Sequence, residues 1–382
     1  MIFLKKRDLY LNKLIALKDK SLIKVITGVR RCGKSSLLSL YEDYLKSVGV
    51  TPQSIIRMDF ESLEFDDIKD YKRLNEYITS KIEESSMTYI LLDEVQSVFE
   101  WERAINSLRL NKNLDIYITG SNGRLLASEL STLLAGRYIE IHMLPLSFKE
   151  FLYFNDIMDD KMALQSGNYS NLNERFNTYI EFGGLPGLTE LWNQKTMIEP
   201  YIEGIYNTII MKDVIKRNEV RDPALLENVI RFMAGNIGNP ISSKKISNYL
   251  TSSGRKTSSE TIDNYLRMFE SAYVLYRAGR YDLKGKQNLK TQGKYYIIDL
   301  GIRNELVGRR GQDYGATLEN IVYFELLRRG FTVKVGHLSG HEVDFVATKS
   351  EQIIYFQVTA TMLAEETRNR ELRPLQAIND NY

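Results

Sequence analysis

Short apolar runs and helical patterns alternate along the first 150 residues. Runs rich in β-branched residues occupy 22–27, 54–60, 88–92 and 114–119. Their continuous apolar character is typical of strands that are buried on both faces of a parallel sheet. Amphipathic stretches separate them, as crossover helices would. The alternation predicts an α/β domain with a parallel sheet at residues 1–150.

The pattern changes after this domain. Residues 151–222 have mostly helical periodicity. Residues 223–298 contain helices followed by two strands, which is the order of a winged-helix module. Strands and helices mix again from 299 to 382, where we expect a small α/β domain that ends early if the chain is truncated at Tyr382. The sequence therefore predicts four domains with these boundaries.

The segment that joins the first apolar run to the helix after it has the pattern G-x-x-x-x-G-K-S. Glycines let backbone N–H groups approach phosphate oxygens, and the start of a helix adds partial positive charge. Strand, glycine loop and helix are the context that a phosphate-binding loop requires. Lys34 is expected to reach the β- and γ-phosphates of ATP, and the Ser35 hydroxyl to ligate Mg²⁺. The predicted ATP-binding residues of this loop are Gly28, Val29, Arg30, Arg31, Cys32, Gly33, Lys34, Ser35 and Ser36.

Two carboxylates, Asp93 and Glu94, end the apolar run at 88–92. In a nucleoside triphosphatase, the first would hold Mg²⁺ through water and the second would orient the attacking water. The predicted catalytic residues thus include Lys34, Asp93 and Glu94, and Ser35 and Asp93 are the predicted metal ligands. Ser121 and Asn122 end the next run, where a sensor of the γ-phosphate would lie.

Further motifs follow in one order along the chain. They are Asp93–Gln96 with Trp101, Thr119–Ser121, Leu134–Arg137 and Pro145–Phe151. This order resembles the prokaryotic AAA-type ATPases that carry a C-terminal domain of the DUF4143 kind, near the STAND and origin-recognition branches. The resemblance covers nearly the whole chain. It implies a strand order of 5-1-4-3-2 with ATP at the carboxyl edge of the sheet.

The same resemblance identifies residues 151–222 as a helical lid. Phe182–Gly187 is similar to the glycine–proline element of that lid, and the flat ring of Pro186 is expected to pack on adenine. A helix–helix turn without a ligand is the alternative.

Two further residues carry open alternatives. Arg137 precedes an apolar strand and is a candidate to sense or stabilise the γ-phosphate, in its own chain or across a subunit boundary. A surface salt bridge of little energetic value is the alternative. Cys32 either turns its side chain inward or, beside two cations and a helix start, is a reactive thiol of lowered pKa.

The winged helix would bind double-stranded DNA, with its recognition helix starting at Thr261. A protein-contact or lid role for the module is the alternative. The candidate phosphate contacts are Lys244, Lys245, Arg255, Lys256, Lys284, Lys286 and Lys290.

The C-terminal segment is similar to the PD-(D/E)xK nuclease core. Glu319 falls on a predicted helix, Asp344 on a strand, and the final tripeptide is Gln357-Val358-Thr359. This tripeptide lacks both the second carboxylate and the lysine, so we expect a nuclease-like fold without catalysis. Migration of Lys334 into the lysine role is the alternative. His337 and His341 lack a third ligand and predict no metal site.

Composition adds limits. The 382 residues carry a net charge of only +2, so any nucleic-acid surface must be local. One cysteine and the lack of a long apolar run favour a cytoplasmic protein without disulfides. The leading hypothesis is an ATPase, dependent on ATP and Mg²⁺, whose nucleotide state regulates binding of DNA, a protein partner or another copy. An ATP-regulated nuclease and a non-hydrolysing ATP-binding scaffold are the alternatives.

Overall fold

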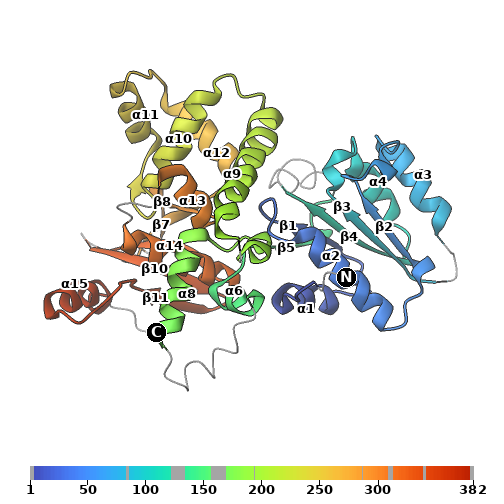
Figure 1. Cartoon of the computed structure of the whole chain (residues 1–382), viewed down its shortest axis with the longest axis horizontal. Coiled ribbons are helices and arrows are strands. Elements are labelled where there is room, and N and C mark those ends of the chain that lie inside the picture. Colours follow the sequence, from blue (N-terminus) through green and yellow to red (C-terminus); the bar gives the residue numbers. More distant parts are fainter. Residues whose placement is uncertain are drawn as a thin grey trace. The chain divides into compact units, whose positions relative to one another are not determined.

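The alternating pattern near the amino end builds a five-stranded parallel sheet (Figure 1). In the computed structural model its order is β2-β3-β4-β1-β5, which confirms the expected 5-1-4-3-2. The strands are β1 (Ile23–Thr27), β2 (Ile55–Asp59), β3 (Thr88–Asp93), β4 (Leu114–Gly120) and β5 (Tyr138–His142).

The structure describes residues 4–82, 86–121, 134–155, 169–192, 194–285, 287–308, 313–338 and 341–378. The chain forms two compact units. The first contains residues 1–145 with 271–273, and the second contains 146–270 with 274–382. The predicted boundaries near 222 and 298 fall inside the second unit.

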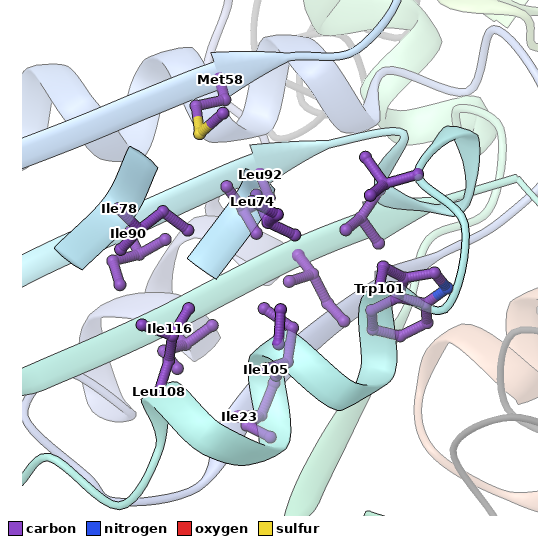
Figure 2. Close-up of a cluster of buried hydrophobic side chains, with 14 of the residues drawn as sticks. Ile23, Met58, Leu74, Ile78, Ile90, Leu92, Trp101, Ile105, Leu108 and Ile116 are labelled. Atoms are coloured by element: carbon purple, nitrogen blue, oxygen red, sulfur yellow. The ribbon is translucent and has the colours of Figure 1, made fainter. Parts of the chain in front are cut away.

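Helices cover both faces of the first sheet because successive strand residues point to opposite sides. Ile116 of β4 packs in the cluster that contains Trp101 of α4 (Trp101–Leu108; Figure 2). The next residue, Tyr117, lies with its ring 4.6 Å from that of Tyr41 in α2 (Lys34–Ser47). Asp70 caps α3 by accepting hydrogen bonds from two backbone N–H groups. The helices are α1 (Asp8–Ala16), α2 (Lys34–Ser47), α3 (Tyr71–Lys81) and α4 (Trp101–Leu108).

The second unit contains a six-stranded mixed sheet of order β11-β10-β9-β7-β8-β6. The pair β7 and β9 is parallel, and the other neighbours are antiparallel. The predicted hairpin of the winged helix therefore shares one sheet with the C-terminal strands. The strands are β6 (Pro240–Ile241), β7 (Leu275–Asp282), β8 (Gln287–Ile297), β9 (Thr332–Leu338), β10 (His341–Lys349) and β11 (Gln352–Phe356).

Helices make up much of the rest of this unit, as the pattern predicts. A π-helical segment, Ile209–Lys216, extends α9 (Ile198–Thr208) where an ordinary helix was expected. No helix among the described residues is both long and apolar enough to cross a membrane. The helices are α6 (Phe148–Phe154), α8 (Tyr169–Phe182), α9 (Ile198–Thr208), α10 (Pro223–Gly235), α11 (Ser243–Ser252), α12 (Ser259–Ser271), α13 (Leu300–Val307), α14 (Tyr314–Arg328) and α15 (Glu365–Gln376).

Candidate nucleotide site

The loop from Gly28 to Gly33 connects the end of β1 to the start of α2. Gly28 has φ +142°, and a Cβ there would overlap the carbonyl oxygen of Met143. Gly33 is the residue before α2 and has φ +102°. Both glycines therefore occupy conformations that other residues rarely adopt. The loop ends where the first backbone N–H groups of α2 have no helical partner, which is a site for anions.

Lys34 is the first residue of α2 and is only 4% exposed. Its Nζ donates hydrogen bonds to the carbonyl oxygens of Gly28, at 3.1 Å, and Val29, at 3.3 Å. The same Nζ lies 3.7 Å from Oε1 of Glu94. The ammonium is thus held against the loop and the carboxylate, in a position from which it can turn to a phosphate.

Asp93 ends β3 and is 1% exposed. Its Oδ1 accepts a hydrogen bond from the hydroxyl of Thr119, the residue before last of β4. Its Oδ2 accepts no hydrogen bond from the part of the chain that the structure describes. Nη2 of Arg57 lies 4.0 Å from this oxygen, which is within ion-pair range but beyond hydrogen-bond distance. A buried polar atom without a hydrogen bond costs about 1–3 kcal/mol, and a metal ion or its water ligands would offset that cost. The residues present therefore fit Mg²⁺.

Glu94 follows in a left-handed conformation, with φ +52°. Its backbone N–H donates to the Thr119 hydroxyl at 2.9 Å. Its Oε2 accepts hydrogen bonds from Nε2 of Gln96 and from the hydroxyl of Ser121, the latter at 3.3 Å. Lys34, Gln96 and Ser121 thus orient one carboxylate. Sequence reasoning expected Ser121 near the γ-phosphate and did not assign a role to Gln96 or Thr119; Asn122 lies outside the described residues.

Arg57 of β2 also reaches this edge, and the sequence analysis missed it. Its Nη2 donates to the backbone oxygen of Ser35 at 3.3 Å and lies 4.0 Å from Oδ2 of Asp93. Its Nη1 lies 3.5 Å from Oε2 of Glu42. The side chain of Ser35 is exposed at the start of α2, and that of Ser36 is half-buried. The sequence did offer one sign of this role, because Arg57 is a basic residue in a predicted apolar strand, and that strand is the neighbour of β3.

Thr27, Glu140 and His142 form a small cluster on β1 and β5 beside the loop. The Thr27 hydroxyl donates to Oε1 of Glu140 and lies 2.9 Å from Nδ1 of His142. Burial, helped by the charge of Lys34, lowers the pKa of His142 to about 4. Burial also raises the pKa of Glu140. His142 is therefore neutral at pH 7, and its ring adds no positive charge to the phosphate site.

The remaining loop residues differ in exposure. Cys32 is fully buried, and burial raises the pKa of its thiol. This supports the inward side chain and contradicts the low-pKa alternative. Arg30 lies 3.0 Å from the carboxylate of Glu61, while Arg31 is exposed with φ +66°. The buried Val29 contributes its carbonyl oxygen to Lys34.

Arg137 lies at the other edge of the sheet. It precedes Tyr138, which pairs with Ile23 at the start of β1, whereas the phosphate loop follows Thr27 at its end. Roughly 16 Å of strand therefore separates Arg137 from the loop. Its Nη1 donates to Oδ1 of Asn106 at 3.2 Å. The structure does not bring Arg137 to the phosphate site of its own chain, and a role across a subunit boundary stays a prediction.

Pro186 begins the 3-10 helix η5 (Pro186–Leu191) in the second unit. The glycines before it contact Asp299, the residue that caps α13. The N–H of Gly184 donates to Oδ2 of Asp299 at 2.7 Å, and a Cβ on Gly183 would overlap that carboxylate. Both glycines thus have a structural role in this turn. Contact between Pro186 and adenine stays a prediction.

In the nuclease-like segment, three carboxylates surround Lys294, whereas the sequence analysis considered Lys334. Nζ of Lys294, on β8, lies 3.0 Å from Glu319, 2.8 Å from Glu342 and 3.7 Å from Asp344. Burial alone would lower the pKa of Lys294, but these carboxylates outweigh it and raise the pKa. Lys334 instead lies 5.3 Å above the ring of Tyr281.

This cluster does not fit a metal ion. The ammonium group of Lys294 faces all three carboxylates, which is where a divalent cation would need to be. Among the described residues, no group of three or more acids, histidines or cysteines is arranged to hold a metal. Gln357 donates to Glu371 at 2.9 Å. The expected loss of nuclease catalysis stays a prediction.

The candidate DNA contacts are on exposed positions of the second unit. Lys244 and Lys245 are exposed on α11, and Lys256 and Lys284 are exposed in loops. Arg255 is also exposed and lies 3.5 Å from Asp222. The side chains of Lys286 and Lys290 lie outside the described residues.

Comparison with known proteins places this geometry in context. A family model described as an AAA domain matches residues 20–152, and a model described as a domain of unknown function (DUF8612) matches residues 173–313. The second differs from the DUF4143 kind, so that part of the resemblance is not confirmed. The phosphate loop, Asp93 and Glu94 all lie within the first match.

Two relatives extend over almost the whole chain. A protein of Haemophilus influenzae described as uncharacterized is 43% identical over 377 residues, which covers 98% of this chain and 91% of the relative. A second uncharacterized protein, from Methanocaldococcus jannaschii, is 31% identical over 368 residues, which covers 94% of this chain and 79% of the relative.

Likenesses to solved structures are weaker. The Aeropyrum pernix ORC1 protein, solved in complex with DNA, has a TM-score of 0.35 at 13% identity over 80% of this chain and 92% of its own. AMPPCP-bound DnaA from Aquifex aeolicus has a TM-score of 0.28 at 15% identity over 68% of this chain and 85% of its own. Scores this low carry no argument about function.

Proposed function

The chain belongs to the same family as these Haemophilus influenzae and Methanocaldococcus jannaschii proteins, and we propose that it is an ATPase whose nucleotide state regulates binding of DNA or of a protein partner. The matching AAA domain supports the nucleotide-binding part. The exposed lysines of α11, in a module of two helices and a hairpin, support the DNA-binding part.

One observation carries the proposal. Asp93 ends β3, and its Oδ2 is buried and accepts no hydrogen bond from the described residues. Its other oxygen, Oδ1, accepts a hydrogen bond from Thr119 on the neighbouring strand. Lys34 and Glu94 lie on the same edge, 3.7 Å apart. A buried carboxylate oxygen without a donor, beside a cation on a glycine loop, is the arrangement that a Mg²⁺–triphosphate would complete.

The roles of the residues follow from these contacts. With ATP bound, Lys34 would exchange the loop carbonyls for phosphate oxygens. Ser35 and Asp93 would hold Mg²⁺, which would supply positive charge to neutralise the phosphates. Lys34 thereby leaves Glu94, whose carboxylate remains oriented by Gln96 and Ser121. Glu94 is then placed to accept a proton from water.

Binding is tested first. Lys34→Ala should weaken ATP binding by roughly 10- to 150-fold, because a charged hydrogen bond contributes about 1.5–3 kcal/mol. Lys46→Ala is the matched control, since Lys46 lies on the same helix, half-exposed and paired with Glu42. Equal ATP affinity in wild type and Lys34→Ala would show that the loop does not bind ATP.

Turnover is tested next. Glu94→Gln should keep ATP affinity and slow hydrolysis by about 10²–10⁴, because an amide does not accept a proton from water. A wild type that binds ATP but does not hydrolyse it would favour the scaffold alternative. Turnover that is the same with and without double-stranded DNA would remove DNA as the regulator.

A further inference from the structure

A pocket of about 770 Å³ lies between α10 and α11 in the second unit. Figure 1 shows these helices side by side, and they pack in direct contact. Its volume is within the range of pockets that bind small organic groups, about 300–1,000 Å³. Two of its lining residues, Lys245 and Arg255, are also candidate phosphate contacts for DNA, but no role proposed above uses the pocket itself.

The charge of the pocket has one sign. Arg231, Lys245 and Arg255 line it, and no aspartate or glutamate does among the residues that the structure describes. Arg231 is held by its hydrogen bond to the backbone oxygen of Leu306, at 2.7 Å, so its guanidinium has a defined place. Asp222 lies 3.5 Å from Arg255 but is half-exposed, and solvent weakens such a pair. The pocket therefore attracts anions.

The pocket also presents an aromatic face. The rings of Phe232 and Tyr249 have their centroids 4.7 Å apart, with 47° between their planes. Tyr249 remains 53% exposed, and its ring packs at a tilt against that of Phe232. An exposed ring that a neighbouring ring holds in place can stack on a flat base at little cost in side-chain entropy. Asn228 adds an amide that can donate to and accept from a base edge.

We propose that this pocket binds an unpaired nucleotide of a single-stranded nucleic acid, with its base stacked on Tyr249 and its phosphates held by Lys245 and Arg255. An acidic peptide would pair with the three cations but would not stack on the exposed ring of Tyr249. An apolar ligand would contact the ring but would not pair with the cations. A nucleotide uses both. A duplex keeps its bases stacked inside the helix, so a base can enter only from a single strand.

The test measures fluorescence anisotropy of a labelled thymidine oligonucleotide about ten nucleotides long, within the usual size of a single-strand site. The oligonucleotide has no triphosphate, so the phosphate loop should not bind it. Tyr249→Ala should weaken binding about tenfold or more, and Tyr249→Phe should bind nearly as wild type does, because it keeps the ring.

The charge is tested separately. Lys245→Ala should lower affinity and make the dependence on salt shallower by about 0.7, the slope of one phosphate contact on a single strand. Lys212→Ala is the matched control, because this exposed lysine of the same unit is not among the candidate DNA contacts and does not line the pocket. Single-strand binding should be unchanged in the control. An equal loss in both lysine variants would overturn the proposal, as would wild-type binding by Tyr249→Ala.

Two further ligands separate the alternatives. Thymidine monophosphate should displace the oligonucleotide only weakly, because it has one phosphate; displacement at equal affinity would identify a free nucleotide as the ligand and overturn the single-strand source. Duplex DNA of the same sequence should bind Tyr249→Ala as well as wild type. A loss of duplex binding in that variant would show that Tyr249 belongs to a general DNA surface and would overturn the pocket. The proposal does not depend on ATP hydrolysis.

Discussion

Gly28→Ala tests whether the shape of the phosphate loop decides nucleotide binding. Alanine would have to keep φ near +142°, a conformation that costs about 1–3 kcal/mol in a residue with a Cβ. The Cβ would also overlap the carbonyl oxygen of Met143 and lie 3.0 Å from Sγ of Cys32. Overpacking of this kind lowers the free energy of unfolding by about a further 1–3 kcal/mol.

The overlap cannot be relieved cheaply, because Met143 contributes backbone rather than a flexible side chain. Its N–H donates to the carbonyl oxygen of Thr27 at 2.8 Å, which holds the two segments together. The total cost is therefore about 2–6 kcal/mol. Gly49→Ala is the matched control, since Gly49 has φ +91° with no atom near the added Cβ, and only a backbone cost of about 1 kcal/mol remains.

The assay combines thermal unfolding with ATP titration. In a domain of this size each kcal/mol lowers Tm by roughly 2–4 °C, so we expect a drop of roughly 4–24 °C for Gly28→Ala and roughly 2–4 °C for Gly49→Ala. ATP affinity should fall in the first variant alone, because the loop must move to accommodate the methyl group. Two variants that unfold together and bind ATP alike would refute this reasoning.

Four other changes have definite expected outcomes. Gln96→Ala should reduce kcat several-fold without changing ATP affinity, because it loosens Glu94 and leaves Lys34 in place; a changed affinity with normal kcat would contradict this. Lys294→Met should lower the free energy of unfolding by about 3–5 kcal/mol, because it leaves buried carboxylates without their cation, and denaturant titration measures it. His142 has a pKa of about 6.5 in the unfolded chain and of about 4 in the folded protein. The free energy of unfolding should therefore fall as the pH drops from 6.5 to 4, by about 3 kcal/mol at most. His142→Gln should remove this dependence, which thermal unfolding at pH 5 and pH 7 measures. A thiol reagent should label Cys32 slowly in the native protein, with or without ATP, and fast labelling would show that the sulfur is accessible.

Local patterns were sufficient where one contiguous stretch contains the whole signal. The strand, the glycine loop and the first turn of α2 are adjacent in sequence, so their spacing predicts both the backbone turn and the place of Lys34. The strand order came from resemblance instead, and the structure confirms it. Pairing between β4 and β1 spans distant parts of the chain, which periodicity cannot detect.

Long-range contacts account for what the sequence analysis missed. Arg137 was a candidate sensor of the γ-phosphate because it precedes a strand. Parallel pairing of β1 and β5 places it beside the start of β1, whereas the phosphate loop follows the end of β1. Lys294 was overlooked because the lysine was sought in the C-terminal tripeptide or at Lys334. It arrives from β8, and its residue number gives no sign that β8, α14 and β10 meet.

The sequence by itself determined the elements, the phosphate loop and the two carboxylates after β3, because each depends on neighbours along the chain. Tertiary structure alone decided how those groups are held. It brought Thr119 to Asp93 and Arg57 to Ser35, it buried Cys32, and it combined the predicted hairpin and the C-terminal strands in one sheet. The reason is physical: burial and hydrogen bonding depend on which strands become neighbours, and pairing is a property of the whole fold.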